Sequence, residues 1–363
     1  LTRLSFWSEY GLNAVTLVRH LVREHILHDS VFEGVETLYF AFDQMNDYYC
    51  AKAIMEKYQT KAEVHRYLSE KILGIQKGKL GNSWNIDIFV NVCALYAEKY
   101  GEECIDVIDE LEDTDDKWQV FSRYINCFQW RNSRYIPIDC FEELLKKYPC
   151  SPEDLWPMLI GNSVKVSHPF NADFLHRFLS SYNLNKRDYL WTIYINELPS
   201  NDTDRLVQLI QMYDRGEKLE ETKEKQIELL LTLFGWLLSS SNRWLRDYTS
   251  KAMIEILKEH FQLCEIILRK FEKVNDPYII QRLYGIVFGA CCKRTDDRGN
   301  QALAEYVYHT VFEQEKVYPD ILLRDYARLI IERFLYEHSE YTGMIERKKI
   351  VPPYNSDPIP EIE

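Results

Sequence analysis

The spacing of apolar residues near the start of the chain predicts a helix followed by a β-hairpin. Between positions 12 and 27, apolar side chains recur at helical intervals, at Leu17, Val18, Leu21, Val22 and Ile26. The segment from 31 to 42 becomes rich in aromatic residues, and Glu33-Gly34 can form its turn. A helix should resume from 48 to 58. A helix followed by a two-stranded wing is typical of the rear part of a winged-helix unit, which we expect over residues 1–60.

From residue 61 onward the pattern is helical, and we expect no further strand. The predicted helices cover residues 61–76, 84–99, 101–112, 117–129, 138–148, 171–182, 187–196, 203–213, 222–239, 243–260, 262–273, 277–292, 300–314 and 319–338. Helix-start signals accompany several of them. Ser151-Pro152-Glu153-Asp154 and Asn201-Asp202-Thr203-Asp204 place a capping side chain before acidic residues, and Asp276-Pro277 places proline at the first helical position. The short loops imply antiparallel helix pairs.

An Arg-x-Tyr element occurs three times in the last third of the chain. Leu245-Arg246-Asp247-Tyr248 recurs as Leu323-Arg324-Asp325-Tyr326, and Arg282-Leu283-Tyr284 lies between them. A shift of 78 residues also superposes the apolar stripes around the first and last copies. The spacings of 36 and 42 residues between the three arginines bracket the roughly 40-residue period of helix-pair repeats.

We therefore predict an all-α fold: an α-solenoid of HEAT-like helix pairs, with a short β-hairpin, a partial winged helix, near the N-terminus. Residues 61–220 form the first part of the helical array and residues 221–345 the HEAT-like repeats. Residues 346–363 form an extended tail, because Pro352-Pro353 and the Pro358-Ile359-Pro360 run cannot continue a helix. Repeat folds of this kind bind other molecules along extended surfaces.

The Arg-x-Tyr element has two interpretations. Arginine and aspartate in the same turn of successive stacked helices can pair along the stack, as a ladder that fixes how each unit sits on the next. Alternatively, the repeated side chains form a row that binds a ligand. The residues concerned are Arg246, Asp247, Tyr248, Arg282, Tyr284, Arg324, Asp325 and Tyr326.

Composition and charge narrow the possible functions. Of the 363 residues, 46% are hydrophobic and 28% charged, which is enough for a core in a soluble chain. The net charge of −13 argues against direct binding of nucleic acid, which depends on clustered Lys and Arg. An acidic cluster from Glu102 to Asp116 is a solvated surface or, less favoured, a docking patch for a basic partner.

The cysteines and hydropathy indicate the compartment. Nine cysteines without a Cys-x-x-Cys pair, no signal peptide and no apolar run long enough for a membrane favour reduced core thiols in a cytoplasmic protein. The chain begins at Leu1 without an initiator Met and without a helix cap, so we expect a fragment of a larger protein.

Catalytic and cofactor-binding signatures are weak. The segment from Gly74 to Leu80 has three residues between its glycines, and Leu80 stands where a phosphate loop needs Ser or Thr. His20, His25 and His28 lack the spacing of a zinc helix, and His260 with Cys264 supplies only two ligands. We predict no enzyme activity, no cofactor and no metal for this chain.

Two stretches resemble STAND-type NTPases, and in particular the large prokaryotic members used in antiviral defence. Residues 38–52, with the sequence Leu-Tyr-Phe-Ala-Phe-Asp-Gln-Met-Asn-Asp-Tyr-Tyr-Cys-Ala-Lys, resemble the end of their ATPase module. Residues 236–289, with Ser241-Asn242-Arg243 and Asn275-Asp276-Pro277-Tyr278, are similar to their helical region. The resemblance implies an upstream P-loop ATPase and an earlier effector, with the helical array recognising a foreign protein and triggering oligomerisation. This chain itself lacks the Walker motifs.

Three hypotheses follow. The first is a non-catalytic protein-interaction region, the sensor or scaffold of a cytosolic STAND NTPase, with a phage protein as a candidate ligand and no contact with membrane or nucleic acid. The second is a free-standing helical-repeat scaffold without an ATPase. The third is an enzyme whose active site is assembled from residues scattered along the chain.

Overall fold

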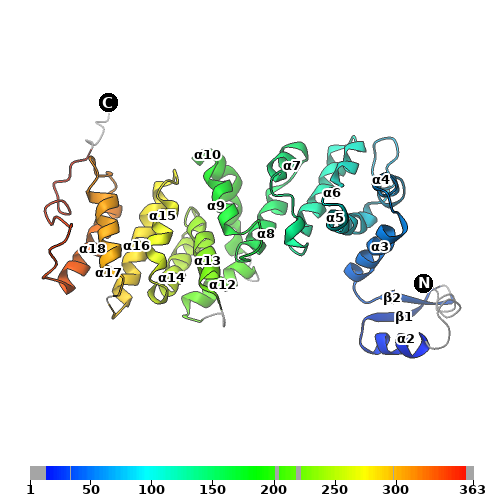
Figure 1. Cartoon of the computed structure of the whole chain (residues 1–363), viewed down its shortest axis with the longest axis horizontal. Coiled ribbons are helices and arrows are strands. Elements are labelled where there is room, and N and C mark those ends of the chain that lie inside the picture. The colour runs from blue at the N-terminus through cyan, green and yellow to red at the C-terminus, as the bar shows by residue number, and fades with distance from the viewer. Residues whose placement is uncertain (1–13, 33, 201–203, 218–221, 297, 357–363) are drawn as a thin grey trace. The chain divides into compact units, whose positions relative to one another are not determined.

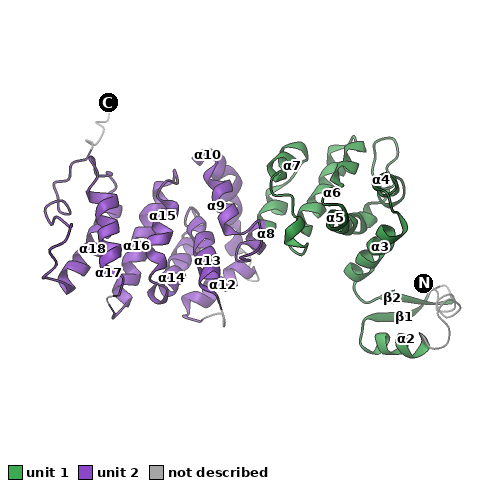
Figure 2. Ribbon diagram, viewed as in Figure 1, with its two compact units in different colours: residues 1–158 green, residues 159–363 purple. Residues whose placement is uncertain are grey.

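The computed structural model describes residues 14–32, 34–200, 204–217, 222–296 and 298–356. The chain is mostly helical, at 66%, with a small two-stranded antiparallel sheet (Figure 1). It divides into two compact units, residues 1–158 and 159–363 (Figure 2). The predicted domain limits at residues 60, 220 and 345 stay predictions.

The first unit begins with the predicted helix and hairpin, but the helix is shorter than expected. Helix α2 (Ala14–Arg23) ends before His25, whose φ of 56° lies in the left-handed region that a helix cannot continue through. The chain then enters strand β1 (Leu27–Phe32), which pairs with β2 (Val35–Phe40) in the register Leu27↔Phe40 to Phe32↔Val35. The predicted helix over 12–27 was therefore wrong at its end, and the predicted hairpin is confirmed.

The rest of the first unit is helical and packs around one central helix. Its elements are α3 (Asp43–Lys57), α4 (Lys61–Tyr67) with the π-helical segment Leu68–Leu73, the 3₁₀ turn Ser83–Asn85, α5 (Ile86–Tyr100), the 3₁₀ segment Ile105–Glu110, α6 (Thr114–Cys127), the 3₁₀ turn Ser133–Tyr135, α7 (Phe141–Lys147) and α8 (Pro152–Asn162), which runs past residue 158. Helix α5 packs against both α3 and α6. It therefore carries much of this unit's core, with Phe89, Val92 and Cys93 fully buried.

Two differences from the predicted helices have identifiable causes. The segment predicted as a helix over 101–112 is a 3₁₀ segment, because Ile105, Ile108 and Leu111 are buried at intervals of three, which suits 3.0 residues per turn. Helix α8 was absent from the predicted ranges although its start signal, Ser151-Pro152-Glu153-Asp154, was recognised; Pro157 lies in its interior, where proline usually ends a helix.

The second unit contains two rows of helices. Its elements are α9 (Ala172–Ser180), α10 (Leu184–Arg187), the π-helical segment Asp188–Thr192, α11 (Ile193–Glu197), the 3₁₀ turn Leu198–Ser200, α12 (Arg205–Asp214), α13 (Glu224–Leu237), α14 (Arg243–Glu259), α15 (Leu263–Phe271), α16 (Pro277–Lys293), α17 (Asn300–Val307), the π-helical segment Tyr308–Phe312 and α18 (Ile321–Glu337). Helices α12, α14, α16 and α18 pack one on the next, and α13, α15 and α17 cover them.

Helix α13 forms the centre of this unit's core. Every described position from Leu229 to Leu237 is buried, as expected for a helix that is hydrophobic all round. Gly235 allows α15 to approach closely, because a Cβ atom there would lie 2.6 Å from the Phe271 ring. The long apolar run in the sequence is therefore a buried helix of the covering row, packed against α9, α14 and α15.

Three helices of one row have the same length, and each has an Asn or Asp side chain as its N-terminal cap. Helices α14, α16 and α18 each have 17 residues, and the side chains of Asn242, Asp276 and Asp320 cap them. Asn242 and Asp320 each accept a hydrogen bond from the backbone N–H three residues later. The 78-residue offset seen in the sequence thus holds from the caps of α14 and α18 to their C-terminal residues His260 and His338.

The described part of the tail lies along α18. Val317 N–H donates to the carbonyl of Asn355 at 2.7 Å, and the Arg324 guanidinium lies 4.9 Å from the centre of the Tyr354 ring. Residues 357–363 of the predicted extended tail lie outside the described residues.

Candidate functional site

A pocket of about 400 Å³ lies at the N-terminal ends of α16 and α18 in the second unit. Its apolar lining comes from five segments of the chain and includes Leu268, Val274, Ile280, Val311 and Leu323. Polar groups of Glu272, Thr310 and Gln314 also line it. A small, mostly apolar hollow with a few polar groups can take an anchoring side chain of a bound protein.

Exposed apolar residues stand next to this pocket along the chain. Tyr318 lines the pocket and is 51% exposed, and Ile321 and Leu322, just before the lining residue Leu323, are 72% and 51% exposed. Tyr278, also exposed, follows the lining residue Pro277. Of these four exposed residues, Tyr318 belongs to the lining and the other three are sequence neighbours of lining residues; exposed apolar residues of this kind are suited to a protein partner. We call the pocket and these four residues the anchor surface.

The structure places the Arg-x-Tyr residues on α14, α16 and α18, but not in one register. Arg246 and Arg324 are each four residues after their helix caps, whereas Arg282 is six residues after Asp276. The tyrosines differ accordingly. Tyr284 is buried and lines the pocket, while Tyr248 and Tyr326 are half-buried. Burial raises the pKa of Tyr284, so this hydroxyl stays protonated.

One rung of the predicted ladder is present between α14 and α16. The Asp247 Oδ1 atom lies 3.3 Å from Nη1 of Arg282, and Arg243 completes the pair on the other carboxylate oxygen at 3.2 Å. These cations lower the pKa of Asp247 against the opposing effect of burial. Between α16 and α18 the link is a different one, since Gln281 Nε2 donates to both carboxylate oxygens of Asp320. Asp325 pairs within its own helix, with Arg328 at 2.6 Å.

Two of the predicted arginines also hold an aromatic ring of the anchor surface. The guanidinium groups of Arg246 and Arg282 lie 5.3 and 5.4 Å from the centre of the Tyr278 ring. Arg246 Nη1 donates in addition to the carbonyl of Ser240 at 2.8 Å. Arg246 and Arg282 therefore fix the position of the Tyr278 ring. Their recurrence in the sequence can be explained by this structural role, without direct contact with a ligand.

We expect Arg246→Ala to lower the free energy of unfolding by about 1–2 kcal/mol, because it removes a charge-assisted hydrogen bond and a cation–π contact. Arg324→Ala should cost about 0.5–1 kcal/mol through its contact with Tyr354. The melting temperature should fall by about 2–4 °C per kcal/mol in a unit of this size. Arg243→Ala, at an exposed side chain, is the control and should shift it least. An Arg246 variant with unchanged melting temperature and lost partner binding would favour the ligand row.

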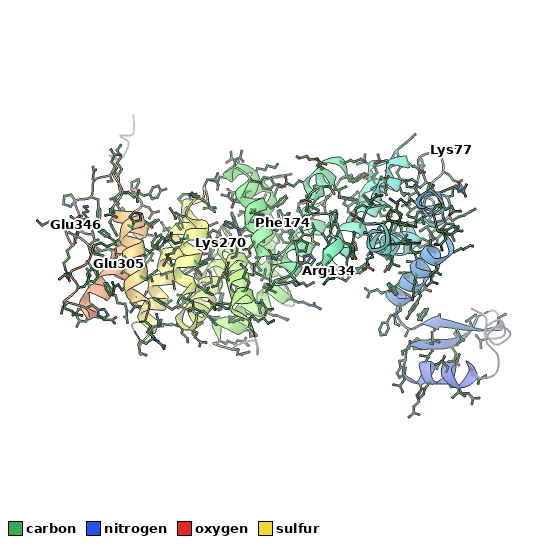
Figure 3. All side chains as sticks on the ribbon, in the orientation of Figure 1. Lys77, Arg134, Phe174, Lys270, Glu305 and Glu346 are labelled. Atoms are coloured by element: carbon green, nitrogen blue, oxygen red, sulfur yellow. The ribbon has the colours of Figure 1, made fainter. Side chains whose placement is uncertain are left out.

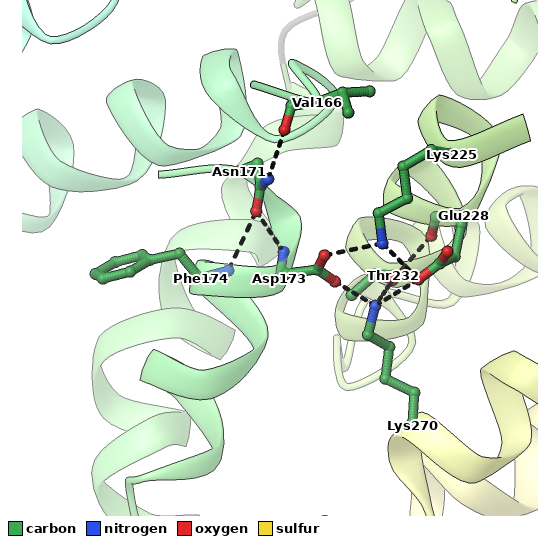
Figure 4. A network of polar contacts seen from close by, with 8 residues as sticks. All are labelled: Val166, Asn171, Asp173, Phe174, Lys225, Glu228, Thr232 and Lys270. Atoms are coloured by element: carbon green, nitrogen blue, oxygen red, sulfur yellow. Dashed lines mark hydrogen bonds and ion pairs between the residues drawn. The ribbon is translucent and has the colours of Figure 1, made fainter. Parts of the chain in front are cut away.

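A second polar cluster joins α9, α13 and α15 (Figures 3 and 4). The ammonium of Lys270 contacts the carboxylate of Asp173, lies 3.2 Å from Glu228 Oε1 and donates to Thr232 Oγ1 at 3.0 Å. Lys225 bridges the same two carboxylates, at 3.0 Å from Asp173 and 2.9 Å from Glu228. Asp173 stands in the first turn of α9, which the Asn171 side chain caps. The ion pairs of this cluster thus hold α9, α13 and α15 together.

His176, one turn beyond Asp173 on α9, should make stability depend on pH. Burial, followed by the charge of Lys270, lowers its pKa to about 4 from the ordinary 6.5. Between these values the unfolded chain binds a proton that the folded chain does not, so stability falls as pH falls through this window. We expect a contribution of about 2 kcal/mol to be lost between pH 7.5 and pH 5.

Urea unfolding at pH 7.5 and pH 5 measures this loss. In His176→Phe, where phenylalanine can pack between Trp236 and Phe271, the dependence should shrink by that amount. His309→Phe, at an exposed histidine, should keep it. Equal pH dependence in the wild type and His176→Phe would contradict the assignment.

Other candidate groups have structural partners. In the Gly74–Leu80 loop, the backbone N–H of Leu80 donates to Asp116 Oδ2 at 2.9 Å, and Gly74 and Gly78 adopt the positive φ of a tight turn. Five of the nine free cysteines are buried, and Cys292 is exposed. Within the residues that the structure describes, no group of three or more His, Cys, Asp or Glu side chains is arranged to hold a metal ion.

Several acidic residues of the cluster from Glu102 to Asp116 form ion pairs or helix caps within the first unit. Glu103 pairs with Arg131, Asp109 with Lys147 at 2.5 Å, and Glu102 with Lys61 at 2.6 Å. Asp113 caps α6. These contacts give part of the cluster a structural role, and a docking patch for a basic partner stays a prediction.

The comparisons give no relative on which to base a function. No protein-family model, curated protein or solved structure matches this chain. Among the described residues, no helix has both the length and the apolar character needed to cross a membrane.

Proposed function

We propose that this chain is a non-catalytic protein-interaction region, built as an α-solenoid of HEAT-like helix pairs. Helices α14 and α18 begin 78 residues apart and have the same length, a side-chain cap at the same position and a histidine at the C-terminal end. These matches support a repeated unit. Packing of α12, α14, α16 and α18 one on the next supports a stacked array. The hairpin beside α2 is compatible with the rear part of a winged helix.

The anchor surface is the main observation that supports the proposed interaction function. Its exposed Tyr318 lines a pocket of about 400 Å³, and the exposed Tyr278, Ile321 and Leu322 are adjacent in sequence to the lining residues Pro277 and Leu323. Binding energy at protein interfaces is concentrated in aromatic and aliphatic side chains beside desolvated pockets. A protein ligand is therefore the partner that this surface fits.

From the sequence resemblance, we further propose that the region is the sensor or scaffold of a larger cytosolic STAND-type NTPase, with a phage protein as its ligand. Residues 38–52 and 236–289 carry that resemblance. A free-standing scaffold is the alternative. Walker A and B motifs encoded ahead of Leu1 would support the NTPase, and a coding sequence without them would favour the scaffold.

Site-specific photo-crosslinking tests the interaction function in the intact protein. A benzoyl-phenylalanine at Tyr318 should crosslink a discrete protein in cells infected with phage. The same group at Tyr336, which is 89% exposed at the far end of α18, serves as the control and should not. Equal crosslinking at both positions, or none at Tyr318 with or without infection, would count against the proposal.

A further inference from the structure

A second hollow, of about 810 Å³, lies over α3, α5 and α6 in the first unit. Its floor is one face of α5, where Asp87, Asn91, Leu95 and Glu98 recur about once per helical turn beside the buried Val90 and Ala94. The first two turns of α3 form one wall. The end of α6 and the loop after it form the other. We call this hollow the acidic groove.

The groove carries more negative than positive charge. Four carboxylates line it, those of Asp43, Asp47, Asp87 and Glu98, against the guanidinium groups of Arg123 and Arg131. Arg131 is neutralised by Glu103, which does not line the groove and accepts two hydrogen bonds from the guanidinium at 2.5 and 3.0 Å. Arg123 therefore faces four carboxylates, and the lining has an excess of three negative charges.

The pKa of Asp47 is affected by this excess of negative charge. Burial, and then the like charges of Asp87 and Asp43, raise its pKa, and a hydrogen bond from Asn46 offsets only part of the rise. A cation placed between these carboxylates would remove the repulsion and favour their ionised forms.

Exposed aromatic rings accompany the carboxylates. Tyr48 and Trp130 line the groove and are 41% and 55% exposed. A further hollow, of about 480 Å³, shares Asp87, Arg123 and Asn126 with the groove and adds Trp84 and Trp118 to its lining. Ring faces beside carboxylates bind guanidinium and ammonium groups, and the rings also pack on the aliphatic stems of Arg and Lys.

We propose that the acidic groove binds an extended segment of a partner protein rich in Arg and Lys. The carboxylates of α3 and α5 would pair with its cationic heads, and Tyr48 and Trp130 would pack on its side chains. The two hollows share three lining residues, which favours an extended segment over a small cation. Nucleic acid has the wrong charge for this lining. The proposal uses no residue of the anchor surface and stands independently of the function proposed above.

Fluorescence anisotropy with a fluorescein-labelled Arg-Lys-Arg-Lys-Arg-Lys peptide tests the proposal on the full chain. We expect saturable binding that weakens as NaCl rises from 50 to 200 mM. Asp47→Asn/Asp87→Asn should weaken binding about tenfold, as expected for the loss of one charge pair at the half-buried Asp47 and one at the exposed Asp87. Trp130→Ala should weaken it about fivefold, and Trp130→Phe should restore most of the affinity.

The control variant is Glu142→Gln/Glu143→Gln. It makes the same change of charge on exposed residues of α7 that do not line the groove, and it should change the affinity less than twofold. Equal weakening in the two double variants would show non-specific attraction to an acidic protein and overturn the proposal. Binding that Trp130→Ala leaves unchanged, and that spermine displaces as well as free peptide does, would also overturn it. Circular dichroism spectra matching the wild type show that the variants fold.

Discussion

Replacing Arg187 with methionine should lower the free energy of unfolding by about 3–5 kcal/mol, because it leaves a buried carboxylate without its cation. The Arg187 side chain is fully buried, its Nη2 lies 3.6 Å from Asp276 Oδ2, and Nη1 donates to Asn275 Oδ1 at 2.8 Å. Its guanidinium also lies 5.3 Å from the centre of the Trp236 ring. Asp276 in turn caps α16, so the pair connects α10 to the start of that helix. The midpoint of urea unfolding, followed by tryptophan fluorescence, measures the loss.

A double-mutant cycle separates the charge from the packing. Arg187→Met/Asp276→Asn keeps the helix cap and removes both charges, so it should recover part of the loss and cost about 1–2 kcal/mol. Arg177→Met, at an exposed position of α9, is the control and should change stability by less than about 0.5 kcal/mol. If the double variant were as unstable as the sum of the two single variants, the ion pair would not be the source of the effect.

Trp236→Ala should also cost about 3–5 kcal/mol, through lost burial and the cavity left behind. This fully buried indole contacts three side chains, with ring-centre distances of 5.6 Å to His176 and 5.3 Å to Phe271 besides its contact with Arg187. Its backbone carbonyl accepts a hydrogen bond from Trp191 Nε1. One side chain thus connects α13 to α9, α10 and α15, and its removal loosens all three contacts.

Urea unfolding monitored by circular dichroism checks this second result. Trp236→Phe keeps an aromatic ring and should recover more than half of the loss. Trp244→Ala removes an indole that is only half-buried, stacked on Tyr248 at 4.5 Å, and should cost about 1 kcal/mol. If Trp236→Ala and Trp244→Ala lowered the free energy of unfolding by similar amounts, the contacts of Trp236 would not be the source of the larger effect expected for it.

The sequence predicted helices well where apolar periodicity and caps agree. Asp276-Pro277 marks the first residue of α16 correctly, and the buried run of α13 is continuous enough to be recognised. Prediction was incomplete where a local feature outweighed periodicity. His25 ends α2 through a positive φ, and α8, for which only the start signal at Ser151 to Asp154 was recognised, contains Pro157 in its interior.

The candidate surfaces were harder to predict, because they depend on how helices pack. Identical letters suggested that Arg282 is equivalent to Arg246, yet their distances from the helix caps differ by two residues. The rung made by Gln281 and Asp320 has no repeated sequence signal. Likewise, the acidic groove joins Asp47 to Asp87, 40 residues apart in the chain. Only the packing of α3 on α5 brings them together.

The neighbour-to-neighbour packing of the second unit has a consequence for how it opens. Helix α18 packs mainly on α16 and α17, whereas α13 contacts α9, α14, α15 and α16. Deuterium should therefore reach the backbone amides of α18 through local fraying, while those of α13 exchange only when most of the unit opens. Local opening should therefore become less frequent from α18 toward α13, so a partner that binds α16 and α18 would stiffen the part of the unit that opens most readily.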